Sequence, residues 1–192
     1  MARVYLAGPE VFRPDAVAEG GRLRRLCAVH GLEGLYPLDG GAAEDTAHDI
    51  RVRCIAGIVR ADAVVANITP FRGAHMDPGT AWEIGFAEAR GVPVFLWSSD
   101  PRALAERIPG TPGHDGLRDA DGHLLEDFGQ PENLMIAPPG VIVWPSPEAA
   151  VAAAAEMLAL RHSLRLGLLP KVLIALAASI VAGYVARLVL HW

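Results

Sequence analysis

Short apolar runs alternate along this chain with longer segments in which apolar residues recur every three or four positions. The short runs are bounded by Gly, Pro or Asp, which is typical of buried strands, whereas the longer spacing is that of an amphipathic helix. The pattern predicts strands at residues 4–7, 35–38, 63–68, 92–97 and 141–144, and helices at residues 15–30, 45–61, 80–90 and about 147–160. Because the two kinds of element alternate, we expect an α/β fold: a five-stranded parallel sheet flanked by helices on both faces, with ligands bound beyond the carboxyl ends of the strands.

One internal segment does not follow this alternation. Residues 98–139 are rich in Gly, Pro and Asp and have little periodicity. A loop of this length inside a compact domain is usually functional or mobile, so we expect it to act partly as a lid and partly as a binding loop. Its D-A-D-G stretch, Asp119–Gly122, lacks the further ligands of a calcium loop, so we expect no calcium site there.

In the C-terminal tail, residues 163–192, Lys171 and Arg187 bracket fifteen apolar or small residues, and counting on to Trp192 gives about twenty. About twenty such residues in a helix would span roughly 30 Å, enough to cross a bilayer. Basic residues precede the run, which would place that end on the cytoplasmic side of the membrane. The tail is therefore a candidate single transmembrane anchor, and the alternative is an apolar helix buried in an oligomer interface.

The composition and charge of the chain limit the classes of function that it can have. The chain has 192 residues, of which 52% are hydrophobic and 20% charged, so we expect one globular domain over residues 1–162 followed by the tail. With 17 Lys and Arg against 22 Asp and Glu, no basic stripe for a nucleic-acid partner is expected. The N-terminus is broken too early by Gly8 and Pro9 to be a signal peptide. We therefore expect a cytoplasmic domain that acts on a small molecule, carried by the tail if it is anchored to the inner membrane.

The two cysteines, Cys27 and Cys54, lie within helical apolar spacing and are expected in the core rather than in a disulfide. The His and Cys residues do not have metal-ligand spacing, and no phosphate-binding glycine motif is present, so we expect no metal and no cofactor.

The stretch DPGTAWEIGFA, Asp77–Ala87, contains the strongest candidate for a catalytic residue, Glu83, and its sequence allows two interpretations of that residue. Thr80 and Glu83 match a capping box, which would make Glu83 purely structural. Alternatively, a carboxylate near a helix N-terminus is held ionised and can act as a nucleophile on an anomeric carbon, with Asp77 delivering a proton to the leaving group. A third carboxylate, Asp62, precedes a predicted strand and is expected to approach the same crevice.

Four blocks, in this order, resemble the nucleoside 2-deoxyribosyltransferase family over roughly residues 3–146: YLAGPEVF (Tyr5–Phe12), ADAVVANITPFRG (Ala61–Gly73), DPGTAWEIGFA and ENLM (Glu132–Met135). The resemblance implies a flavodoxin-like, Rossmann-like sheet. It implies an enzyme that exchanges the base of a 2'-deoxynucleoside for another free nucleobase through a deoxyribosyl-glutamate intermediate, in nucleoside salvage.

The resemblance also implies a role for individual residues. Glu83 would be the nucleophile and Asp77 would contact and protonate the base. Asp62 would bind or orient the deoxyribose, and Tyr5 would hold the carboxylate of the nucleophile.

The N-L-M block implies oligomerisation. In this family the Asn of the block reaches into a neighbouring subunit's site and the Met lines that site, which here indicates Asn133 and Met135. We therefore expect a homo-oligomer, either a dimer or a trimer of dimers. Two other functions stay open: an N-glycoside hydrolase of deoxynucleosides or their monophosphates, in which Glu10 would disfavour a phosphate, and a membrane-tethered nucleoside sensor without turnover. The tail lies outside the resemblance.

Overall fold

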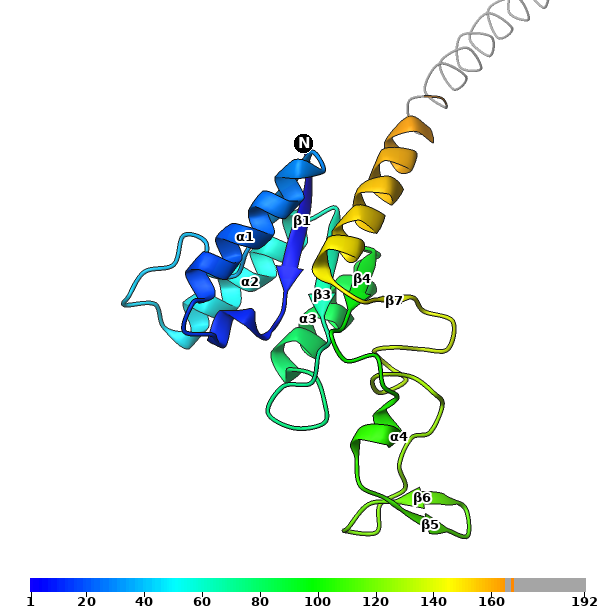
Figure 1. Ribbon diagram of the computed structural model, residues 1–192. Helices are drawn as coiled ribbons and strands as arrows, with labels where there is room; N and C mark the ends of the chain where they lie inside the picture. Colours follow the sequence, from blue (N-terminus) through cyan, green and yellow to red (C-terminus); the bar gives the residue numbers. More distant parts are fainter. Residues whose placement is uncertain (165–166, 168–192) are drawn as a thin grey trace, which may run out of the picture. The chain divides into compact units, whose positions relative to one another are not determined.

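A computed structural model describes residues 1–164 and 167, in which two compact units are distinguished, Met1–Ala155 and Glu156–Trp192. The first unit is built on a five-stranded parallel sheet, which confirms the predicted fold class (Figure 1). The strand order is β2-β1-β3-β4-β7, the order of flavodoxin-like folds. The strands are β1 (Ala2–Ala7), β2 (Leu32–Leu35), β3 (Ala63–Asn67), β4 (Val94–Trp97) and β7 (Val143–Trp144).

The helices that cover this sheet are α1 (Ala16–Val29), α2 (Ala47–Arg60) and α3 (Pro78–Ala89), and residues 147–155 are also helical. A short 3-10 helix, η1 (Pro9–Phe12), follows β1. Thr46 is the N-cap residue of α2 and forms a capping box with Asp49.

Alternate side chains of β1 point to opposite faces of the sheet and meet different helices. Tyr5 belongs to a buried cluster with Ile58 of α2 and Ile84 of α3. On the other face, the side chain of Leu6 on β1 and that of Cys27 on α1 both lie close to Gly34 of β2. Tyr5 therefore points toward α2 and α3, and this face of the sheet carries the candidate site.

Several element boundaries differ from the predicted ones by a few residues, and for two of them the structure shows the reason. The second strand is Leu32–Leu35 rather than residues 35–38, because Tyr36 begins a turn in which its N–H donates to the Asp39 carboxylate. Helix α3 begins at Pro78 rather than Thr80, because Pro is suited to the first helical position.

The segment 98–139 is more ordered than its composition predicts. It contains the single-turn helix α4 (Leu104–Arg107) and an antiparallel hairpin formed by β5 (Thr111–Gly113) and β6 (Gly116–Arg118) (Figure 1). Its end is fixed by Glu132, whose side chain is 3% exposed and accepts hydrogen bonds from the main-chain N–H groups of Met76 and Asn133. The segment is thereby attached to the loop that leads into α3.

In the second unit only residues 156–164 and 167 are described, and these are helical. The anchor predicted from residues 163–192 thus falls almost entirely outside the described residues. Among the described residues, no helix has both the length and the apolar character needed to cross a membrane.

Candidate active site

A hydrogen bond between two distant parts of the chain defines the site. The Tyr5 hydroxyl donates to Oε1 of Glu83 at 2.6 Å, joining β1 to α3 across 78 positions of sequence. The Tyr5 ring is 1% exposed and packs against Gly57 of α2, where an added Cβ would lie only 2.8 Å from the ring. Because Gly57 has no side chain, the Tyr5 ring fits between the sheet and α2, and its hydroxyl reaches the Glu83 carboxylate.

The start of α3 decides between the two readings of Glu83. Asp77, not Thr80, is the N-cap residue: its Oδ2 accepts hydrogen bonds from the Thr80 N–H at 2.8 Å and the Thr80 hydroxyl at 3.0 Å. The capping box predicted for Thr80 and Glu83 is therefore wrong, because Pro78 shifts the helix start and a better cap precedes it. Glu83 instead accepts a hydrogen bond from the Tyr5 hydroxyl.

The surroundings of Glu83 favour its protonated form more than water would. Burial raises the pKa of Glu83, and nearby Asp77 raises it further, whereas the Tyr5 hydroxyl and the Cys54 thiol lower it, leaving a pKa of about 7. Burial, and then the charge of Glu83, raise the pKa of Tyr5, so that its hydroxyl stays protonated and donates. A carboxyl group with a pKa near neutrality in a cavity is typical of a catalytic position.

Glu83 faces an open cavity of about 440 Å³ lined by Arg51, Cys54, Gly79, Trp82 and Glu83. The Arg51 guanidinium lies 4.6 Å from the centre of the Trp82 ring, so a cation and an aromatic face form one side of the cavity. The volume is within the usual range for small-molecule sites.

Cys54 is a site residue that sequence reasoning missed. Its place in an apolar run predicted a core thiol, but the side chain is only partly buried and lines the cavity beside Glu83. Its helical spacing to Gly57, the residue that contacts Tyr5, is the signal that could have indicated this position.

The structure does not bring Asp62 to this cavity. Asp62 precedes β3 at the amino edge of the sheet, where its carboxylate accepts the Arg3 N–H at 2.8 Å and its own N–H donates to the Arg3 carbonyl. The side chain is exposed and is not among the residues that line the Glu83 cavity. Its recorded contacts are those of a residue that joins β1 to β3.

The N-L-M block lies on the chain segment fixed by Glu132. The Asn133 amide donates to the Glu126 carboxylate, and its oxygen accepts the Met135 N–H at 3.0 Å. The Met135 side chain is 74% exposed. Neither residue lines the Glu83 cavity of its own chain.

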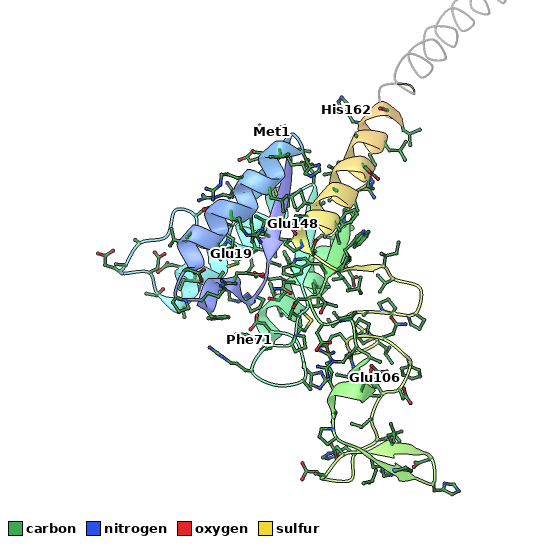
Figure 2. All side chains as sticks on the ribbon, viewed as in Figure 1. Met1, Glu19, Phe71, Glu106, Glu148 and His162 are labelled. Carbon is green, nitrogen blue, oxygen red and sulfur yellow. The ribbon has the colours of Figure 1, made fainter. Side chains whose placement is uncertain are left out.

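A second cavity, of about 400 Å³, lies at the carboxyl edge of the sheet. Figure 2 labels three of its lining residues, Glu19, Phe71 and Glu148, and Glu10 and Asn67 also contribute to it. Glu10 is 6% exposed and accepts a hydrogen bond from the Asn67 amide at 2.6 Å, and burial raises its pKa.

Among the described residues, one group of side chains is close enough together to ligate a cation: Asp119, Asp121 and His123. The Asp119 carboxylate already accepts the main-chain N–H groups of Asp121 and His123. The group is thus a hydrogen-bonded turn in the segment after β6.

The fold and the site together define an α/β enzyme with a half-buried carboxylate in its cavity. The sequence profile of the nucleoside 2-deoxyribosyltransferase family matches residues 4–135, and the chain belongs to that family. It is therefore a pentosyltransferase, as the resemblance of the four sequence blocks implied.

Proteins similar to this chain include an enzyme of solved structure and an uncharacterized protein. A 2-desoxiribosyltransferase from Leishmania mexicana has 37% sequence identity and a TM-score of 0.71, with 81% of this chain and 98% of that chain covered. An uncharacterized protein of Schizosaccharomyces pombe is 33% identical, over 69% of this chain and 74% of its own length.

Proposed function

We propose that this enzyme transfers 2-deoxyribose between nucleobases of 2'-deoxynucleosides through a covalent intermediate on Glu83, as a step in nucleoside salvage. The observation that carries the proposal is the placement of Glu83, which is held by the Tyr5 hydroxyl at 2.6 Å and faces a cavity of about 440 Å³. A pKa of about 7 leaves a substantial ionised fraction of Glu83 at neutral pH, and the ionised carboxylate is the nucleophile.

In the first half-reaction, an oxygen of Glu83 attacks C1' of the deoxyribose. The bond between C1' and the base nitrogen breaks, its electron pair goes to the base, and Asp77 supplies the proton that makes the departing base neutral. The two recorded hydrogen bonds to Asp77 both fall on Oδ2, which leaves Oδ1 as the oxygen to deliver this proton. The product is a deoxyribosyl ester of Glu83.

In the second half-reaction, a nitrogen of the incoming base attacks the same C1' and the ester bond to Glu83 breaks. The proton lost by the incoming base returns to Asp77, so the enzyme is restored. The Tyr5 hydroxyl remains beside Glu83 throughout, while the negative charge of Glu83 is lost on ester formation and restored when the ester breaks. Trp82 and the Arg51 guanidinium provide a flat apolar and cationic surface beside the reacting carbon.

The test is a base-exchange assay by chromatography with a 2'-deoxynucleoside, with and without a second free base. Wild type is compared with Glu83→Ala and with Glu88→Ala, an exposed glutamate on the same helix that serves as the matched control. A new deoxynucleoside that needs the acceptor base, forms with wild type and Glu88→Ala, and is absent with Glu83→Ala supports the proposal. Free base released without exchange would indicate a hydrolase, and no turnover would indicate a binding module.

We further propose that a second copy of the chain completes the site with Asn133 and Met135. This is supported by the exposure of Met135 and by the position of both residues outside the cavity of their own chain. The prediction is tested by mixing two inactive variants, Glu83→Ala and Asn133→Ala. In a mixed oligomer one site has both wild-type residues, so activity should reappear on mixing, whereas a chain that works alone would show none.

Membrane association of the tail rests on sequence alone and stays a prediction. Its test is the partition of the full chain between membrane and soluble fractions, compared with a chain that ends at His162. Equal partition of the two chains would contradict it.

A further inference from the structure

Cys54 occupies a position on α2 that faces both Tyr5 and Glu83. Gly57 and Ile58 follow it on the same side of the helix, at the spacing of adjacent helical turns. Gly57 contacts the Tyr5 ring, and Ile58 is buried in the cluster that contains Tyr5. Cys54 packs against this cluster and lines the same cavity as Glu83.

The thiol can serve there as a proton donor. Burial raises the pKa of Cys54, so the sulfur keeps its proton at neutral pH. The Tyr5 hydroxyl donates to one of the two Glu83 oxygens, Oε1. A carboxylate accepts several hydrogen bonds, and a thiol is a weak donor that matters most beside a charged acceptor.

We propose that Cys54 is a positioning residue for Glu83, whose carboxylate receives a hydrogen bond from the thiol on α2 as well as from Tyr5 on β1. This role rests on the proposed function, in which ionised Glu83 attacks the sugar. The titratable and charged groups that face Glu83 are Tyr5 from β1, Cys54 and Arg51 from α2, and Asp77 at the start of α3. Cys54 is thus one of two neutral donors around the nucleophile.

Three variants of the full chain separate this role from simple packing. Cys54→Ala removes the donor, and Cys54→Ser keeps a donor in a side chain of similar shape. Cys27→Ala is the matched control, because it deletes the other thiol, which is buried in α1 against the opposite face of the sheet. If Cys54→Ala does not fold, Cys54→Val takes its place, because it also removes the donor while filling the space of the thiol.

The first readout is the pH dependence of kcat/KM. Cys54→Ala should move the acid limb upward by about half a unit to one unit, because a donor to the charged form is lost. Cys54→Ser should restore most of the wild-type profile, and Cys27→Ala should leave it unchanged. A Cys54→Ala profile equal to that of wild type, or an equal shift in Cys27→Ala, would overturn the proposal.

The second readout needs no turnover. Carbon-13 NMR titration of the Glu83 carboxyl, assigned with Glu83→Gln, should give a higher midpoint in Cys54→Ala than in wild type. An unchanged midpoint would overturn the positioning role. If wild type has no exchange activity but the midpoint still rises, the proposed function fails while the role of Cys54 stands.

Discussion

The Tyr5 hydroxyl on β1 donates a hydrogen bond of 2.6 Å to the Glu83 carboxylate on α3. The contact depends on a glycine at position 57, which admits the Tyr5 ring, and on Asp77, which starts α3 so that Glu83 is free of capping. The packing of β1 against α2 and the N-cap of α3 together place the Glu83 carboxylate at the cavity.

Tyr5→Phe removes this hydrogen bond while keeping the ring that packs on Gly57. Because a hydrogen bond to a charged group contributes about 1.5–3 kcal/mol, kcat/KM should fall by roughly tenfold to a hundredfold. The acid limb of the pH profile should also move upward, since the Tyr5 bond lowers the pKa of Glu83. Steady-state kinetics across pH check both effects, and wild-type kinetics in this variant would mean that Tyr5 only fills the core.

The sequence predicted the sheet and most helices because their apolar spacing is unambiguous, as in the fully buried β3 and the capped α2. The start of α3 was misjudged because two caps compete, and only the three-dimensional structure shows that Asp77 binds the Thr80 N–H. Strand 35–38 was misplaced because Tyr36 is buried but belongs to a turn.

Tyr5, Asp77 and Glu83 were predicted as site residues from their sequence blocks. In the structure Tyr5 donates to Glu83, and Asp77 is near enough to raise the pKa of Glu83, but Asp77 does not line the Glu83 cavity. Cys54 was missed because thiols are usual in helical cores, and its approach to Glu83 depends on how α2 packs across the sheet. Sequence spacing alone does not show that the Asp62 carboxylate stays at the amino edge of the sheet, where it accepts the Arg3 N–H, instead of reaching the Glu83 cavity.

The pKa of Glu83 makes stability depend on pH. Its folded value of about 7 lies above the ordinary 4.5, so the folded state binds the proton more tightly than the unfolded state. The resulting stabilisation is complete below about pH 4.5 and is lost as pH rises through 7. Glu83→Gln, which cannot ionise, should therefore be more stable than wild type at pH 8, by about 1–2 kcal/mol, and nearly equal to it at pH 5. Thermal unfolding at the two pH values measures this, and a gain that is the same at both would contradict the raised pKa of Glu83.

Asp77 is predicted to have two separable roles. Asn is as good an N-cap as Asp, so Asp77→Asn should change stability by only a few tenths of a kcal/mol while abolishing most exchange activity, because it has no carboxyl proton to give. Asp77→Ala should lose activity and also about 1 kcal/mol of stability. Urea unfolding and the exchange assay on both variants make the comparison, and full activity in Asp77→Asn would remove Asp77 from the reaction.

Asp62→Asn tests the placement of this residue at the amino edge of the sheet. The amide oxygen of Asn still accepts the Arg3 N–H, so we expect kcat/KM to stay within about twofold of wild type and stability to change by less than about 1 kcal/mol. The role implied by the family resemblance, contact with deoxyribose, would instead raise KM for the nucleoside strongly. Steady-state kinetics with a 2'-deoxynucleoside distinguish the two.

The most direct test of the account is to trap the covalent intermediate. The full chain is mixed with a 2'-deoxynucleoside in the absence of an acceptor base, quenched with acid and digested, and the peptides are analysed by mass spectrometry. We predict one deoxyribosyl group on the peptide that contains Glu83, and its loss when an acceptor base is added before the quench. An enzyme that exchanges bases normally but carries no sugar on Glu83, or carries it on another residue, would contradict the central claim.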